Sequence, residues 1–184
     1  MNKKIIFITG GARSGKSSFA LAEASHIKGL KAYIATAESL DEEMEKRIEK
    51  HRKDRGNDWD TFEEPLKIAQ TLQKTADDHA VVLLDCLTLW VSNLLHAGVD
   101  IQEKMDGLIN ALMKYKTGTG KASVMIIVSN EVGMGIVPGN EMAREFRDWA
   151  GILNQKVASA ADEVYVTVSG IPVKIKGNSS APSP

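Results

Sequence analysis

Short apolar runs alternate along the chain with segments whose apolar residues recur at helical spacing. Five runs have the length and composition of buried strands, and they cover residues 5–9, 31–35, 80–84, 123–129 and 163–168. A further run, residues 172–176, is predicted to form a short edge hairpin with the fifth. Strands that alternate with helices in this way are typical of an α/β fold, in which a mostly parallel sheet carries helices on both faces.

The segments between these runs have the periodicity of amphipathic helices and cover residues 16–27, 41–55, 65–76, 87–96, 101–115 and 141–161. Pro65 is predicted to occupy the first turn of its helix, because the N–H group that proline lacks would have no partner there. The chain has no internal repeat. We therefore predict one domain over residues 1–177, followed by a flexible tail at residues 178–184.

The composition argues against several classes of function. The 184 residues include 23 basic and 24 acidic side chains, a balance that disfavours binding to nucleic acid or to anionic membranes. No apolar run approaches the roughly 20 residues that a membrane-spanning helix requires. Cys86 is the only cysteine and the N-terminus does not resemble an export leader, so a cytoplasmic protein is expected. Any site that binds an anion must therefore come from a local group of residues and not from the overall charge of the chain.

The stretch GGARSGKS matches the phosphate-loop motif G-x-x-x-x-G-K-[ST], and it stands between the first predicted strand and the first predicted helix. In such a loop backbone N–H groups point at phosphate oxygens, and the helix N-terminus adds partial positive charge. Lys16 is expected to reach the β- and γ-phosphates, and the Ser17 hydroxyl to hold Mg²⁺. A glycine-rich turn without a ligand is the alternative, but every motif position agrees with nucleotide binding. The predicted contacts are Gly10, Gly11, Ala12, Arg13, Ser14, Gly15, Lys16 and Ser17.

Asp85 ends the buried run VVLL, where a carboxylate can hold Mg²⁺ through a water molecule, as a Walker B residue does. Ligands of such sheets lie beyond the carboxyl ends of the strands. The segments that follow three of the predicted strands, residues 36–55, 85–93 and 130–138, are therefore expected to complete the site. Asn130 and Glu131 would shape the acceptor side or sense the γ-phosphate, and an ordinary glycine-rich loop is the alternative.

The stretch RIEKHRKDRG places His51 in a strongly charged helical segment. Acidic and basic residues four apart, such as Glu49 and Lys53, favour a solvated helix face. Arg47, His51 and Arg55 are also four apart, and such a stripe repels itself unless an anion lies on it. Three interpretations remain open from the residues alone: a solvated face, a clamp for nucleotide phosphates, and a nucleophile that attacks the α-phosphorus.

Other charged side chains are weaker candidates for chemistry. His26 and His96 fall near the C-termini of predicted helices, where a cation interacts favourably with the helix dipole, and His79 precedes a predicted strand. Arg144 and Arg147 lie on a predicted helix whose apolar positions face the core, so we expect structural or interfacial roles for them.

Seven stretches of the chain together resemble one known family. They are GGARSGKSS, YIATAE, DEEMEKRIEKHRKDR, WDTFEEP, LLDCLTLWVSNLL, VSNEVGMGIVP and FRDWAGILNQKVASAADEVYVTVSGIPVKIK. The resemblance extends over residues 3–176 and is to the bifunctional adenosylcobinamide kinase and adenosylcobinamide-phosphate guanylyltransferase family of cobalamin biosynthesis. It implies a P-loop NTPase fold with a RecA-like, mostly parallel sheet.

The resemblance also implies an activity. Enzymes of this family phosphorylate the aminopropanol hydroxyl of adenosylcobinamide with a nucleoside triphosphate. They then transfer GMP from GTP to that phosphate through a GMP-histidine, which gives adenosylcobinamide-GDP and pyrophosphate. The same resemblance implies GTP and ATP as substrates and Mg²⁺ as cofactor. It also implies adenosylcobinamide and its phosphate as partners, and a homo-oligomer such as a trimer.

Carried over by motif, His51 is the residue that would receive GMP, and Lys16 would act on the phosphates. One departure is visible at Gly56, where many relatives have proline, and it concerns only how the helix ends. Beyond the phosphate loop, the resemblance implies nucleotide contacts from Ala35, Thr36, Ala37, Arg52, Lys53, Asp54, Arg55, Glu63 and Asp85.

Three other functions share parts of this pattern. A small-molecule kinase without a covalent intermediate is compatible with the loop and stays open. A regulatory GTPase would need an N-K-x-D motif, which the sequence lacks, and the D-x-x-G at residues 148–151 lies in a predicted helix. A nucleic-acid-dependent ATPase would show a basic face and aromatic platforms, whereas only 5% of the residues are aromatic. Because the loop binds the phosphates and not the base, the preference for ATP or GTP in the kinase step stays open. The residues that contact the corrinoid also stay open.

Overall fold

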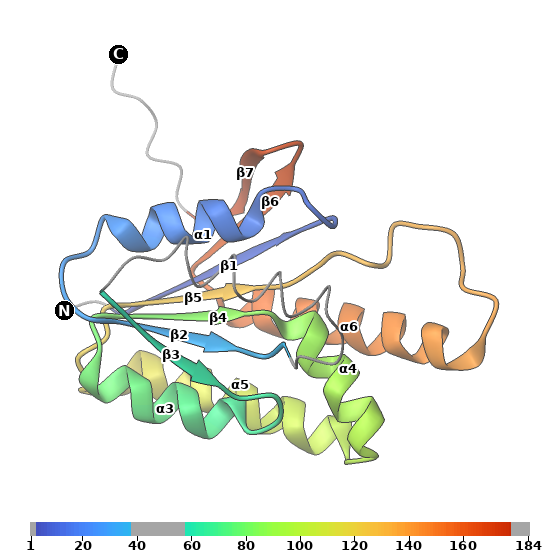
Figure 1. The fold of residues 1–184 in the computed structure, drawn as a ribbon, viewed down its shortest axis with the longest axis horizontal. Helices are drawn as coiled ribbons and strands as arrows, with labels where there is room; N and C mark the ends of the chain where they lie inside the picture. The colour runs from blue at the N-terminus through green and yellow to red at the C-terminus, as the bar shows by residue number, and fades with distance from the viewer. Residues whose placement is uncertain (1–2, 38–57, 178–184) are drawn as a thin grey trace.

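A seven-stranded sheet forms the centre of the protein in a computed structural model, which describes residues 3–37 and 58–177. The strand order is β3-β2-β4-β5-β1-β6-β7, and the strands are parallel except for β7, which runs antiparallel to β6 (Figure 1). The prediction of a mostly parallel sheet is confirmed. The strands are β1 Lys4–Gly10, β2 Lys31–Ala35, β3 Trp59–Glu63, β4 Val81–Asp85, β5 Val124–Val128, β6 Glu163–Val168 and β7 Ile171–Lys176.

The described helices divide unequally between the two faces of the sheet. Helix α1 covers one face, whereas α3, α4, α5 and α6 cover the other (Figure 1). The connections from β1 to β2 and from β2 to β3 run along the sheet in one direction, and the crossovers from β3 to β4, β4 to β5 and β5 to β6 run in the opposite direction. Right-handed crossovers therefore place their helices on opposite faces. The helices are α1 Lys16–Ser25, α3 Ile68–Asp78, α4 Leu87–Ala97, α5 Ile101–Thr117 and α6 Glu141–Ala160.

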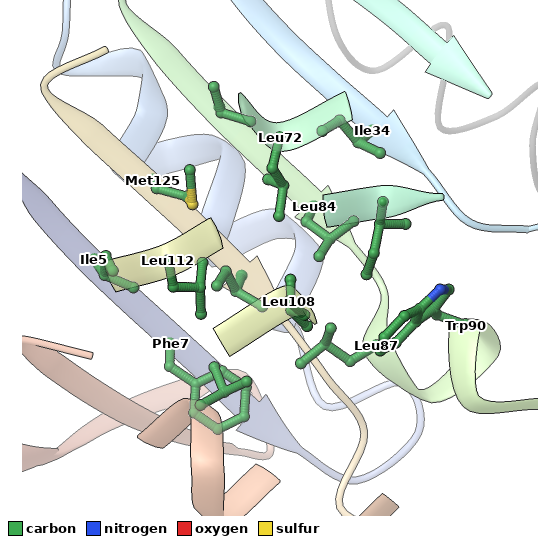
Figure 2. Close-up of a cluster of buried hydrophobic side chains, with 14 of the residues drawn as sticks. Ile5, Phe7, Ile34, Leu72, Leu84, Leu87, Trp90, Leu108, Leu112 and Met125 are labelled. Atoms are coloured by element: carbon green, nitrogen blue, oxygen red, sulfur yellow. The ribbon is translucent and has the colours of Figure 1, made fainter. Parts of the chain in front are cut away.

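The core explains why the strand runs are mostly apolar. Ile5 and Phe7 of β1 contribute to the cluster beneath α3 to α6, while Ile6 and Ile8 contribute to the cluster beneath α1. Side chains that alternate along the inner strands are thus buried on both faces, which favours apolar residues at successive positions. Figure 2 shows the larger cluster, in which Trp90 lies at one end. Its indole N–H donates to the Leu66 carbonyl at 2.9 Å, which satisfies the polar atom of this buried ring.

Two expectations differ from the structure. The edge strand β3 has no predicted counterpart, because only Trp59 and Phe62 are partly buried and the run WDTFE lacks clear alternation. Pro65 does not lie in the first turn of a helix, since α3 begins at Ile68. The Glu64 carboxylate accepts the N–H groups of Leu66 at 3.1 Å and Lys67 at 2.7 Å, which closes a side-chain turn before the helix begins.

Of the other expectations, one agrees with the structure and two concern residues outside the described ranges. The hairpin of β6 and β7 is confirmed, and Ser169 and Gly170 between the strands have φ of 51° and 84°. Positive φ at both central residues is what a type I′ hairpin turn requires. The predicted helix at residues 41–55 and the tail at 178–184 lie outside the described residues. No helix in the described ranges is long and apolar enough to span a membrane.

Candidate functional site

The predicted site residues that the structure describes meet at one edge of the sheet. The parallel register aligns Glu63, Ala35 and Asp85 across β3, β2 and β4. The same row continues through β5 to Ile8 of β1, and the phosphate loop begins two residues later at Gly10. This is the carboxyl edge of the strands, where α/β sheets bind ligands. His51 and the Arg52, Lys53, Asp54 and Arg55 that follow it lie outside the described residues.

The phosphate loop leads directly into α1. Gly15 is the N-cap residue in a left-handed conformation, with φ of 95°, and it supplies no side-chain cap. The first turn of α1 also contains no acidic residue. The N–H groups at this helix end are therefore not paired with a capping side chain, and the positive end of the helix dipole faces the loop. Together with the loop backbone they form a site suited to phosphate.

Lys16 places its ammonium group against the loop. Only 6% of this residue is exposed, and its Nζ donates to the Gly11 carbonyl at 2.6 Å and to Ser14 Oγ at 3.4 Å. Burial lowers the pKa of Lys16, and the nearby Cys86 and Asp85 partly offset that effect. The cation thus lies in a partly desolvated position, where its interaction with a phosphate is stronger than in water.

Three oxygen groups gather beside the start of α1. The carboxylate of Asp85 accepts hydrogen bonds at the same atom, Oδ2, from Ser17 Oγ at 2.9 Å and from Tyr33 OH at 2.9 Å. A hydroxyl and a carboxylate are hard oxygen donors of the kind that Mg²⁺ prefers, usually with phosphate oxygens and water as its other ligands. Ser17 and Asp85 therefore fit a magnesium ion by chemistry and position. Sequence reasoning did not identify Tyr33, although its place in a buried strand two residues before Ala35 is a usable signal.

Thr36 and Asn93 fix the backbone around this group. Thr36 is fully buried, and its Oγ1 donates to the Cys86 carbonyl at 2.7 Å and accepts from the Cys86 N–H at 2.8 Å. Asn93 Nδ2 donates to the carbonyls of Thr36 at 2.8 Å and Pro65 at 3.1 Å. The Thr36 side chain is therefore engaged within the protein, while Ala37 is partly exposed. Asn93 stands in a predicted helix and had no signal beyond its position after a strand.

Cys86 is not a nucleophile in this site. Burial raises the pKa of its thiol to about 12, and the neighbouring Asp85 carboxylate acts in the same direction. Because the thiolate is the reactive form, a thiol with such a pKa is inert near neutral pH.

The hairpin of β6 and β7 contacts the other side of the loop. Ser14 Oγ lies 2.7 Å from Thr167 Oγ1, and the Ser14 carbonyl accepts the Gly170 N–H at 3.0 Å. A Cβ atom on Gly15 would lie 3.2 Å from Gly170 Cα, so the two backbones are in close contact. Thr167 and Gly170 were not among the predicted site residues.

The segment after β5 begins at the site and then becomes exposed. The Glu131 N–H donates to the Gly10 carbonyl at 2.9 Å, and the Asn130 N–H donates to Thr88 Oγ1 at 2.6 Å. Further along, Met134 and Ile136 are 86% and 98% exposed. The segment is thus anchored beside the phosphate loop at one end and presents apolar side chains to solvent beyond it.

Two histidines within the described ranges, His79 and His96, have local partners for their rings. His79 is buried, its Nδ1 lies 3.0 Å from the Thr75 carbonyl and its Nε2 lies 3.1 Å from Asp60 Oδ2. His96 Nδ1 lies 2.8 Å from the Ser92 carbonyl, and His26 follows the end of α1. Arg144 likewise donates to the carbonyls of Pro138 and Gly139. These contacts agree with the structural roles expected for these side chains.

Comparison with solved structures supports the fold. The chain resembles the assembled ATPase EscN of the enteropathogenic Escherichia coli type III secretion system, with a TM-score of 0.59 and 13% sequence identity. The match covers 91% of this chain and 43% of the ATPase chain, so this protein spans less than half of that neighbour. The similarity is one of fold, and together with the phosphate-loop motif it agrees with the predicted P-loop NTPase fold.

Comparison with known sequences identifies the family. Residues 6–175 match the model of the cobinamide kinase / cobinamide phosphate guanyltransferase family. The bifunctional adenosylcobalamin biosynthesis protein CobP of Pseudomonas aeruginosa is 44% identical, over 92% of this chain and 96% of its own. The corresponding CobU proteins of Escherichia coli and Salmonella typhimurium are 42% and 41% identical, each over 94% of this chain and 99% of its own. The chain therefore belongs to the cobinamide kinase / cobinamide phosphate guanyltransferase family of cobalamin biosynthesis.

Proposed function

We propose that this protein carries out two successive reactions at its one phosphate loop. It phosphorylates adenosylcobinamide with a nucleoside triphosphate, and it then transfers GMP from GTP through a GMP-histidine at His51 to give adenosylcobinamide-GDP and pyrophosphate. The observation that carries the proposal is the grouping of Lys16, Ser17 and Asp85, in which the Ser17 hydroxyl lies 2.9 Å from the Asp85 carboxylate. Family membership supplies the substrates.

In the kinase step, the aminopropanol hydroxyl attacks the γ-phosphorus, the bond to the β-γ bridging oxygen breaks, and the nucleoside diphosphate leaves. Lys16 supplies positive charge to the phosphate oxygens, and the N-terminus of α1 supplies N–H groups. Ser17 and Asp85 would hold Mg²⁺, which when bound neutralises charge on the β- and γ-phosphate oxygens. The hydroxyl proton passes to solvent water as the new phosphorus–oxygen bond forms.

The second step requires a different phosphorus atom. A nitrogen of neutral His51 attacks the α-phosphorus of GTP, the bond between the α-phosphorus and the bridging oxygen breaks, and pyrophosphate leaves. An oxygen of adenosylcobinamide phosphate then attacks the same phosphorus and releases His51. A single loop cannot aim the γ-phosphate at an alcohol and the α-phosphate at a second acceptor at the same time. Transfer to His51 separates the two events.

The remaining nucleotide contacts are part of the same proposal. The position of Glu63, Ala35 and Asp85 in one row beside the loop supports their assignment to the nucleotide. We assign Arg52, Lys53, Asp54 and Arg55 on motif grounds alone. The other members of the set are Gly10, Gly11, Ala12, Arg13, Ser14, Gly15, Thr36 and Ala37.

A homo-oligomer, with a trimer as the expected form, belongs to the proposal as well. A corrin ring is too large for one domain of this size to enclose, and Met134, Ile136 and Val137 are 86%, 98% and 63% exposed in the segment that follows β5. An apolar surface of this kind is typical of an interface. Sedimentation velocity should give a species larger than one chain, and a monomer at micromolar concentration would count against the assembly.

Labelled GTP tests the covalent step. Protein incubated with Mg²⁺ and GTP labelled at the α- or the γ-phosphate is denatured and assayed for retained label. We expect only α-label, released by acid and stable to alkali, as for a phosphorus–nitrogen bond. His51→Asn should abolish it, whereas His96→Asn, which alters an exposed histidine on α4, should not. If wild-type protein retains no α-label but still phosphorylates adenosylcobinamide, it is a kinase without a covalent intermediate.

A further inference from the structure

A chain of hydroxyl groups connects the phosphate loop to β6. Thr167 lies directly opposite Gly10 in the parallel ladder of β1 and β6, and only 1% of Thr167 is exposed. Its Oγ1 lies 2.7 Å from Ser14 Oγ and donates to the Thr9 carbonyl at 3.3 Å. Lys16 Nζ in turn donates to Ser14 Oγ at 3.4 Å. The four groups form one continuous path from the loop ammonium to the backbone of β1.

Counting protons gives this path a single direction. Each hydroxyl carries one hydrogen, so a Thr167 hydroxyl that donates to the Thr9 carbonyl can only accept from Ser14. Ser14 has then used its one hydrogen and presents lone pairs to Lys16. The order is Lys16 to Ser14 to Thr167 to the Thr9 carbonyl, and every donor along it has an acceptor. Hydrogen bonds aligned in this way polarise one another in a low-dielectric surrounding.

The surrounding backbone leaves little room for any other arrangement. A Cβ atom on Gly10 would lie 2.6 Å from Thr167 Oγ1 and 2.8 Å from Ser14 Oγ, so the hydroxyl pair occupies the space that a side chain at Gly10 would need. The Gly170 N–H also donates to the Ser14 carbonyl at 3.0 Å. Ser14 is therefore fixed through both its side chain and its backbone by the β6–β7 hairpin.

We propose that Thr167 is a positioning residue for nucleotide binding, which orients the Ser14 hydroxyl as an acceptor for Lys16 and holds the loop in the conformation that receives phosphate. This inference rests on the proposed nucleotide chemistry at the loop. Because both reactions use that loop, both depend on Thr167 to a similar degree. Thr167 acts through Ser14 and does not touch the nucleotide.

Two substitutions at this position separate the hydroxyl from the volume of the side chain. Thr167→Val keeps the shape and removes the hydroxyl, whereas Thr167→Ser keeps the hydroxyl. Thr75→Val is the matched control, since Thr75 is also 1% exposed and its hydroxyl donates to the Thr71 carbonyl within α3 at 2.7 Å. GTP affinity is measured by equilibrium dialysis, and folding by thermal denaturation. KM for the nucleotide is measured in each half-reaction.

We expect Thr167→Val to weaken GTP binding roughly 5- to 30-fold, as for the loss of a buried hydrogen bond beside a charged group. KM should rise by a similar factor in both half-reactions, Thr167→Ser should restore the affinity to within about 2-fold, and Thr75→Val should leave it unchanged. Ser14→Ala should match Thr167→Val, and the double variant should be no weaker than the weaker single variant, because both break one path.

Several outcomes would overturn the inference. If Thr167→Val binds GTP as tightly as Thr75→Val, or if Thr167→Ser does not restore binding, the hydroxyl has no positioning role. Should Thr167→Val fail to fold, Thr167→Ala, which also removes the hydroxyl, takes its place, with Thr75→Ala as the matched control. The inference would also be overturned if the losses of GTP affinity in Ser14→Ala and Thr167→Val add in the double variant. Wild-type protein that does not bind GTP at all would refute the proposed function, whereas normal wild-type binding with an unaffected Thr167→Val refutes this inference alone.

Discussion

The phosphate loop has two kinds of neighbour, and they differ in chemistry. On one side, Asp85 carries a negative charge and accepts hydrogen bonds from Ser17 and Tyr33 at 2.9 Å each. On the other side, Ser14 meets Thr167 and Gly170 through neutral groups, with Ser14 Oγ 2.7 Å from Thr167 Oγ1. The charged side can hold a cation and neutralise phosphate. The neutral side can only fix the shape of the loop.

This difference separates the effects expected from substitution. Groups that interact with developing charge influence the rate of the chemical step, because their contribution grows in the transition state. Groups that only position the loop influence binding of substrate and transition state alike, so they change KM more than kcat. Variants on the charged side should therefore lower kcat in both reactions, and variants on the hairpin side should mainly raise KM.

The largest effect is expected at Lys16. Lys16→Met should lower the rates of nucleotide-dependent phosphorylation and of self-guanylylation by roughly 100- to 1000-fold, as for removal of a group that stabilises transition-state charge. Because burial lowers the pKa of Lys16, replacing the cation with an apolar side chain should not reduce the melting temperature of the ligand-free protein. Lys104→Met on α5, where the lysine side chain is 41% exposed, is the matched control. Equal activity of the two variants would show that the charged side is not catalytic.

A smaller loss is expected at Asp85. Asp85→Asn keeps the size of the side chain and removes its charge, so both rates should fall about 10- to 100-fold and the Mg²⁺ concentration for half-maximal rate should rise. Titration with Mg²⁺ at saturating GTP measures both quantities. Asp106→Asn, which removes an exposed carboxylate 2.7 Å from Lys156, should leave both unchanged. An unaltered Mg²⁺ requirement in Asp85→Asn would contradict the metal assignment.

The smallest effect on this side is expected at Tyr33. Tyr33→Phe removes the hydroxyl that donates to Asp85 Oδ2, so the carboxylate loses one of its two orienting partners. The Mg²⁺ requirement should rise roughly 2- to 10-fold, which corresponds to one hydrogen bond, with little change in GTP affinity without metal. Tyr115→Phe, which removes a hydroxyl bond of 3.3 Å to the Lys4 carbonyl, is the control. If Tyr33→Phe instead lowers the affinity for GTP without metal, Tyr33 positions the loop, as the residues of the β6–β7 hairpin do.

The two sides also differed in how far the sequence predicted them. The phosphate-loop motif is one contiguous stretch, residues 10–17, so it can be recognised directly in the sequence. Asp85 could be predicted because it ends a buried strand, and sheets of this kind bind ligands at the carboxyl ends of their strands. The contact of Ser14 with Thr167 joins residues 153 positions apart. It depends on the register of β6 against β1, which the pattern of apolar residues does not specify, and threonine in a strand is unremarkable by itself.

The same reasoning accounts for the errors in the fold. The buried strands β1, β4 and β5 were predictable because continuous apolar runs are required where both faces are covered. Strand β3 lies at the edge of the sheet and exposes Asp60, Thr61 and Glu63, so its composition does not distinguish it from a loop. The helix after Pro65 begins later than predicted, at Ile68, because residues 64–67 form a side-chain turn in which the Glu64 carboxylate accepts the N–H groups of Leu66 and Lys67.

The most direct test of one loop serving both reactions is the number of nucleotides bound per chain. Equilibrium dialysis of His51→Asn protein with labelled GTP and labelled ATP avoids consumption of GTP by covalent transfer. We expect saturation at one nucleotide per chain, with excess ATP displacing all of the GTP and excess GTP displacing all of the ATP. Binding of GTP and ATP together, at two nucleotides per chain, would contradict the shared loop.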